Sequence, residues 1–120
     1  MSTLPRDRAL TLIEAHLALL VASPDVQEAW ATAERVPAEE IALQYYDAIP
    51  LWLTGLRERG SIDSADEEAL HRLNDYLRRV QPKLFVDGPH VTRAPEWELV
   101  RELAGAALST VRRPISEKHA

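Results

Sequence analysis

The chain has 120 residues, of which 46% are hydrophobic and 28% charged, and these values are typical of one soluble domain rather than of a disordered or membrane-spanning chain. It has no cysteine, which excludes disulfides, thiolate zinc sites and a cysteine nucleophile. The formal net charge of -5 argues against a general nucleic-acid binder, because affinity for the phosphate backbone comes mainly from lysine and arginine. The first ten residues show no secretory signal pattern, and apolar runs such as LALLVA at 17–22 are too short to span a bilayer. We therefore expect a cytoplasmic protein that binds neither nucleic acid nor membrane.

The first two predicted helices lie in the first third of the chain. Pro5 suits a first helical turn, and large apolar residues then recur from Leu10 to Leu20 at spacings of three and four, which predicts a helix over about 5–22. Ser23 offers its hydroxyl as an N-cap and Pro24 fits the first position of a second helix. This second helix is predicted to end near the sequence RVP at 35–37.

The third predicted helix contains an internal proline. Pro37 should open it, with Glu39 and Glu40 near its positive end, where the helix dipole favours acids. Pro50 should interrupt it, since proline has no N–H for the helical hydrogen bond. The apolar residues nevertheless keep their helical phase across this position, and the proline falls on the opposite side. The sequence therefore predicts either one helix kinked at Pro50 or two helices that meet there, ending at a C-cap at Gly60.

The clearest local signal is the sequence SADE at 64–67. It matches a capping box, which predicts Ser64 as the N-cap of a fourth helix with Glu67 as its reciprocal partner. This helix should end at 81–82, where proline follows glutamine. Residues 82–94, PKLFVDGPHVTRA, contain two prolines and an Asp-Gly pair, which indicates a loop or a short hairpin, and we favour the loop.

Pro95 opens the last predicted helix, whose apolar residues cover an unusually wide arc that includes Trp97. We expect this helix to lie at the centre of the fold. The helix should close before Pro114, leaving 114–120 as a flexible tail. The fold prediction is therefore an all-α domain over 1–113, a single compact bundle of five or six helices with no sheet beyond the hairpin left open near 84–92.

Two groups of side chains could support chemistry. Glu67, His71 and Asp75 stand at i, i+4 and i+8 on one helix face, as metal ligands might be spaced, but that face lies opposite the apolar stripe and carries the acid-before-base pairs of an exposed helix. His16 lies in the apolar arc of the first helix and could act as a base, although such a histidine more often packs at a core edge and bonds a backbone carbonyl. We therefore predict no metal and no cofactor. A small enzyme that uses His16 or the Glu67, His71 and Asp75 face remains the alternative function.

A candidate binding surface lies on the outward side of the third predicted helix. Adjacent residues on a helix point about 100° apart, so Tyr45 is predicted to face the core and Tyr46 to face solvent. The outward side combines an apolar centre with an acidic rim: Glu39, Glu40, Leu43, Tyr46 and Asp47, with Pro50 beside them. This composition favours recognition of a protein partner with a basic surface. The alternative, that Leu43 and Tyr46 pack beneath a neighbouring element, stays open.

The segment YYDAIP at 45–50 resembles the recognition segment of the colicin nuclease immunity proteins, which are small, acidic and all-helical. In addition, ALLVASPDVQEAW at 18–30 and APEWELVRELAGAAL at 94–108 resemble the beginning and the end of a family of short, uncharacterised actinobacterial helical proteins. This second resemblance implies an all-α fold without an established activity, and neither resemblance carries over a catalytic residue. We therefore expect a non-catalytic acidic protein-binding module, in the manner of an immunity or antitoxin-like neutraliser of a basic effector.

Overall fold

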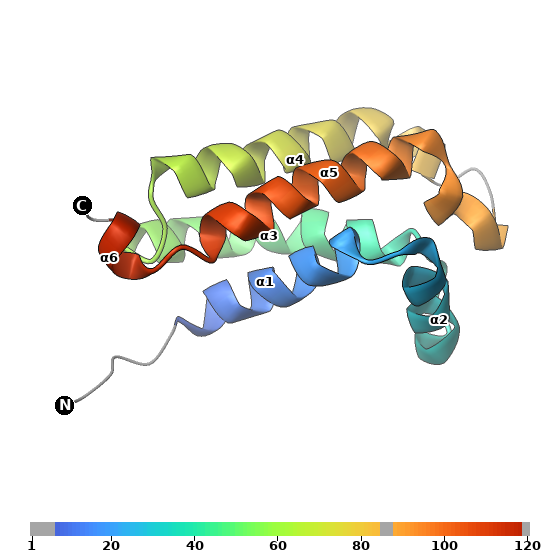
Figure 1. The fold of residues 1–120 in the computed structure, drawn as a ribbon, viewed down its shortest axis with the longest axis horizontal. Coiled ribbons are helices and arrows are strands. Elements are labelled where there is room, and N and C mark those ends of the chain that lie inside the picture. The colour runs from blue at the N-terminus through green and yellow to red at the C-terminus, as the bar shows by residue number, and fades with distance from the viewer. Residues whose placement is uncertain (1–6, 85–87, 119–120) are drawn as a thin grey trace.

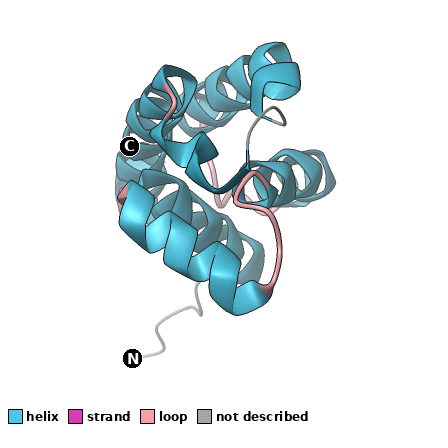
Figure 2. Ribbon diagram, turned by 90° about the vertical axis from the view of Figure 1, so that its right-hand side faces the viewer, coloured by secondary structure: helices cyan, strands magenta, loops and turns pink. Residues whose placement is uncertain are grey.

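The computed structural model describes residues 7–84 and 88–118, without the side chains of 81–84, 88–90 and 115. Within these residues the backbone forms helices and no strand (Figure 2), which confirms the predicted all-α bundle. The elements in chain order are α1 (Arg8–Val21), α2 (Pro24–Glu34), α3 (Glu40–Glu58), α4 (Ser64–Leu84), the 3-10 helix η1 (Gly88–Arg93), α5 (Pro95–Val111) and α6 (Ile115–Lys118).

Four long helices form the body of the molecule. The helices α1, α3, α4 and α5 run alternately in opposite directions along the long axis (Figure 1), which is the up-down-up-down arrangement of a four-helix bundle. Both α1 and α4 pack against α3 and against α5. The expectation of a central last helix is therefore wrong, because α5 occupies one corner of this ring. The wide apolar arc of α5 is explained by its packing against α1, α4 and η1.

The two short helices lie at opposite ends of the bundle (Figure 1), with α2 at one end and α6 at the other. The axis of α2 is bent by 118° from that of α1. Among the described residues, no single helix is long and apolar enough to cross a membrane, and only α1 and α2 taken together as a bent pair have the necessary length and composition.

The core lies between the four long helices. Its large, fully buried side chains are Leu10, Ile13, Leu17 and Leu20 of α1, Ile41, Tyr45, Ile49 and Leu56 of α3, Leu70, Leu73 and Leu77 of α4, and Trp97 of α5. The burial of Trp97 confirms its predicted role as a core anchor. Trp30 of α2 and Trp52 of α3 are only partly buried at the edge of the core.

Local chemistry explains where the first helices begin. The carboxylate of Asp7 accepts a hydrogen bond from the amide of Ala9 at 3.0 Å and so caps α1, whereas the predicted start at Pro5 lies outside the described residues. The hydroxyl of Ser23 accepts from the amide of Val26 at 3.3 Å, which confirms the predicted start of α2.

The third helix begins later than predicted and is continuous. Residues 37–39 form a turn in which the amide of Glu40 donates to the carbonyl of Pro37 at 3.0 Å, so the prediction that Pro37 opens this helix is wrong. Pro50 lies inside α3 on its exposed side, where the loss of one backbone hydrogen bond does not end the helix. Of the two alternatives left open by the sequence, the single helix is therefore the one observed.

The predicted N-cap of α4 is wrong by one residue. The helix begins at Ser64, whose side chain is exposed, and the capping residue is Asp63. The carboxylate of Asp63 accepts from the amide of Asp66 at 2.9 Å, and the carboxylate of Asp66 accepts from the amide of Asp63 at 3.0 Å. This is a capping box built from two aspartates.

The ends of α4 and of the chain also differ from the predictions. The helix α4 continues through position 82 to Leu84, and the described part of the next segment forms η1 rather than a hairpin or an irregular loop. Residues 115–118 form α6 instead of the loose tail that the sequence predicts. The side chain of Lys118 is buried against the start of α4, where its ammonium group lies 3.1 Å from the carboxylate of Asp66. Residues 85–87 and 119–120, which also belong to these predictions, lie outside the described part of the chain.

Candidate functional site

The turn between α2 and α3 is built around a residue in a left-handed conformation. Arg35 has φ 58° and ψ 42°; its amide donates to the carbonyl of Thr32 at 3.2 Å, and the amide of Val36 donates to that of Ala31 at 3.1 Å. These two bonds define a Schellman motif, in which glycine is the usual left-handed residue. Gly60 fills the same position after α3, with φ 69°. The motif at Arg35 turns the chain sharply, so that 36–39 return beside α2.

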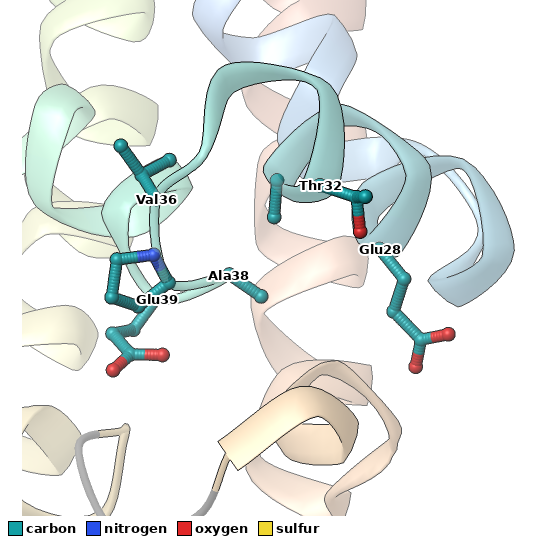
Figure 3. A pocket seen from close by; sticks show the side chains of 7 residues that line it. Glu28, Thr32, Val36, Ala38 and Glu39 are labelled. Carbon is teal, nitrogen blue, oxygen red and sulfur yellow. The ribbon is translucent and has the colours of Figure 1, made fainter.

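A pocket of about 530 Å³ lies between α2 and this returning segment. It is lined by Glu28, Ala31 and Thr32 of α2 and by Val36, Pro37, Ala38 and Glu39 of the turn (Figure 3). Most of the wall is apolar, and the two glutamates supply its charge. Their side chains extend in the same direction, away from the bend of the turn, with Ala38 between them (Figure 3).

The two carboxylates of the pocket have different surroundings. Glu28 accepts hydrogen bonds from the guanidinium group of Arg93 at 3.0 and 3.2 Å, and Asp25 also pairs with this guanidinium. These carboxylates raise the pKa of Arg93 and hold η1 against α2. In contrast, Glu39 makes no ion pair within 7–84 and 88–118. The pocket therefore combines one carboxylate engaged by the chain's own arginine with one that faces no described cation.

The predicted binding surface begins at this pocket. Glu39 lines the pocket, and the other residues of the surface follow it on α3. Asp47 is exposed, and the remaining four are partly exposed: Glu39, Glu40, Leu43 and Tyr46. Tyr46 packs against the hydrophobic core with part of its surface and leaves the rest accessible. The pocket could not be predicted from helical periodicity, because it depends on the turn at Arg35 bringing α2 beside the start of α3.

His16, the candidate base of the alternative function, does not line the pocket. Its half-buried ring lies against Trp52, with ring centroids 5.9 Å apart and an interplanar angle of 40°. Burial lowers the pKa of His16, which favours the neutral ring. In the described part of the chain its ring nitrogens make no hydrogen bond, so the expected bond to a backbone carbonyl is not formed.

The second candidate site, the Glu67, His71 and Asp75 face of α4, does not act as one cluster, because its two acids belong to separate ion pairs. Glu67 pairs with Arg57 of α3, and Asp75 accepts a hydrogen bond from Arg78 at 3.0 Å. His71 is exposed. Among the described residues, no three histidine, aspartate or glutamate side chains are grouped so that they could hold a metal ion.

Comparisons of the chain with protein-family models, with curated proteins and with solved structures found no match. The family resemblances noted in the sequence therefore stay expectations.

Proposed function

We propose that this protein is a non-catalytic, acidic binding module that acts in the cytoplasm as an immunity or antitoxin-like neutraliser of a basic effector. The proposed contact face, called the α3 face below, consists of Glu39, Glu40, Leu43, Tyr46 and Asp47. Its partner is a protein with a basic surface.

The observation that carries this proposal is the setting of Tyr46. One side of its ring packs against the core, which limits the conformational entropy that binding would cost, and the remaining surface is accessible. Tyrosines of this kind are common anchors of protein interfaces, because they offer a large apolar area together with a polar hydroxyl.

The charges around Tyr46 indicate the sign of the charge on the partner's surface. Glu39, Glu40 and Asp47 form no ion pair with any cation of the described chain. Elsewhere the protein uses its arginines to pair its acids, for example Arg59 with Asp7. Carboxylates that the fold leaves unpaired around an aromatic anchor attract a basic protein surface and accelerate its approach.

Photocrosslinking in the cells of origin tests this proposal directly. A photoreactive phenylalanine analogue is placed at Tyr46, and a matched control carries it at Arg72, which is exposed on α4. We expect a basic protein to be crosslinked from position 46 and not from position 72. With that protein purified, Tyr46→Ala should weaken binding by roughly 2 kcal/mol in calorimetry, as truncation of an aromatic hot spot does.

Charge reversal separates steering from anchoring. Asp47→Lys should slow association and reduce its dependence on salt, because rim charges act mainly on encounter. Glu102→Lys on α5 is the control, since it makes the same change of charge at an exposed site away from the α3 face. The proposal is wrong if position 46 crosslinks no more than position 72, or if the two charge reversals slow association equally.

A further inference from the structure

We infer that the pocket between α2 and the turn at 36–39 receives an arginine side chain of the basic partner, with its guanidinium group paired to Glu39. This inference rests on the proposed function, because it names the group by which the partner engages the end of the α3 face. It is supported by the lining of the pocket, the surroundings of its two carboxylates and the hydrogen bonds that hold its wall.

The lining suits a side chain with a long apolar part. Ala31, Val36, Pro37 and Ala38 form a largely hydrocarbon wall. The volume of about 530 Å³ lies within the roughly 300–1,000 Å³ of ordinary ligand pockets and leaves room for the main chain beside the inserted group. The methylene groups of an arginine can lie along this wall while its charged end reaches the carboxylates.

The carboxylates favour a cation in the pocket, and they favour a guanidinium group over an ammonium group. Glu28 and Glu39 extend in the same direction from the two sides of the pocket (Figure 3), so a bound group meets negative charge on both sides. A planar guanidinium can place a flat apolar surface against Pro37 while it donates through its edge to Glu39. A lysine ammonium is more strongly hydrated and lacks such a surface, so it loses more on entering an apolar pocket.

Arg93 shows that this side of the pocket already accepts a guanidinium. It binds Glu28 and Asp25 from η1 and so neutralises part of the charge at this side. Removal of this cation would make the charge at this side of the pocket more negative and so strengthen its attraction for the incoming arginine. Substitution of Arg93 and substitution of Glu39 are therefore expected to change affinity in opposite directions, which a general loss of structure would not do.

The wall of the pocket is held in place before binding. The two hydrogen bonds of the Schellman motif fix the start of the turn, and the amide of Ile41 donates to the carbonyl of Ala38 at 3.2 Å at its end. Ala38 is itself buried. A rigid wall lowers the ordering cost of binding, which favours capture of a single inserted side chain.

The test uses the full chain, isotopically labelled, and three probes that share the same butyl chain: n-butylguanidinium, n-butylammonium and the neutral n-butylurea. We expect n-butylguanidinium to shift the amide signals of Ala31, Val36 and Ala38 in a saturable way, with about three- to tenfold weaker binding of n-butylammonium and no saturation with n-butylurea. Glu39→Gln should weaken n-butylguanidinium binding about three- to tenfold, as expected for the loss of a charge-assisted hydrogen bond at a partly exposed site. Arg93→Gln should tighten it, and the control Glu102→Gln should leave it unchanged.

The outcomes separate this inference from the proposed function. If n-butylguanidinium shifts signals over the whole surface without saturation, or binds no better than n-butylurea, the inference is overturned, while crosslinking of a basic protein from position 46 would leave the proposed function in place. The inference is also overturned if Glu39→Gln and Glu102→Gln weaken binding equally. If the pocket binds n-butylguanidinium but no basic protein is crosslinked from position 46, the proposed function fails, and the assignment of the ligand to an arginine of a partner fails with it.

Discussion

Asp63 and Asp66 cap each other at the start of α4, because the carboxylate of each accepts a hydrogen bond from the backbone amide of the other, at 2.9 and 3.0 Å. The same two carboxylates also accept hydrogen bonds from the guanidinium group of Arg113, at 2.9 to 3.0 Å. One pair of acids therefore begins a helix and ties it to the end of α5.

The first prediction concerns the identity of this cap. Asp63→Ala should lower the free energy of unfolding by about 1 to 2 kcal/mol, because it leaves the amide of Asp66 without its partner. The neighbouring substitution Ser64→Ala should change it by less than about 0.5 kcal/mol, since the exposed hydroxyl caps nothing. Urea denaturation followed by circular dichroism measures both. A larger loss from Ser64→Ala than from Asp63→Ala would restore the cap that the sequence predicts.

The wrong prediction of this N-cap shows a limit of local sequence signals. Aspartate and serine are almost equally good N-caps, so Asp63 and Ser64 both satisfy the pattern three residues before an acid. The start of α2 was predictable, because Ser23 is followed at once by Pro24 and no competing cap lies beside it. The sequence therefore predicts the number of helices and their order better than it predicts their first residues.

The second prediction concerns Lys118, which is buried near the end of the chain. Its ammonium group donates to the carbonyls of Val111 at 2.9 Å and Ser61 at 3.2 Å, and it lies 3.1 Å from the carboxylate of Asp66. Lys118→Met should destabilise the protein by about 3 kcal/mol, at the lower end for a broken buried ion pair, because Arg113 still neutralises Asp66. Thermal unfolding measures the loss, with the exposed change Glu117→Gln as control.

Equal stability of Lys118→Met and Glu117→Gln would show that α6 contributes nothing to the fold. The sequence could not predict the position of Lys118, because the short, polar C-terminal segment has no apolar stripe. Its burial depends on an aspartate on another helix, far away along the chain. Such a pairing exists only in the folded protein.

The third prediction concerns pH. Hydrogen bonds from Arg59 at 2.5 and 3.1 Å, supported by Ser61 at 2.7 Å and the amide of Ala9, lower the pKa of Asp7 from its ordinary value of 3.8 to about 2. The unfolded chain thus binds a proton at a pH where folded Asp7 does not. The stability that this carboxylate confers is complete above about pH 4 and is lost as the pH falls through about 2.

A comparison of the melting temperatures of the protein and of Asp7→Asn between pH 6 and pH 2 tests this dependence. The asparagine keeps an oxygen that can cap α1 but has no charge for Arg59. We expect the protein to melt above the variant at pH 6 and the difference to close near pH 2. A difference that stays constant over this range would mean that the charge of Asp7 does not stabilise the fold.

The fourth prediction concerns the turn that forms the pocket. Arg35 holds a left-handed conformation that costs a residue with a side chain roughly 1 kcal/mol relative to glycine. Arg35→Gly should therefore stabilise the protein by about 0.5 to 1 kcal/mol. Arg35→Ala controls for the loss of the guanidinium group, because it keeps the backbone cost. If glycine and alanine have the same effect in urea denaturation, the turn is not strained at this position.

This turn also explains why the site was only partly predictable. Helical periodicity placed Tyr46 on the outer side of α3, and the structure leaves that residue partly exposed. Nothing in the sequence marks Arg35 as left-handed, since that conformation normally calls for glycine or asparagine. A reader of the sequence could have found the pocket only by treating RVP as a tight reversal rather than as the end of one helix and the start of another.

The last prediction compares two adjacent tyrosines that differ in burial. Tyr45 is fully buried, and its hydroxyl donates to the carbonyl of Leu70 at 3.0 Å, whereas Tyr46 packs on the core with only part of its ring. Tyr45→Phe should therefore cost about 1 kcal/mol, the usual net value of one buried hydrogen bond. Tyr46→Phe should change stability by less than about 0.5 kcal/mol.

Tyr45→Ala should cost roughly 3 to 5 kcal/mol through the cavity that it leaves, and Tyr46→Ala about 1 to 2 kcal/mol for the half-buried ring. Urea denaturation of the four variants measures these differences. If Tyr46→Ala destabilises the protein as much as Tyr45→Ala does, the ring of Tyr46 serves the core alone, and the α3 face loses its proposed anchor.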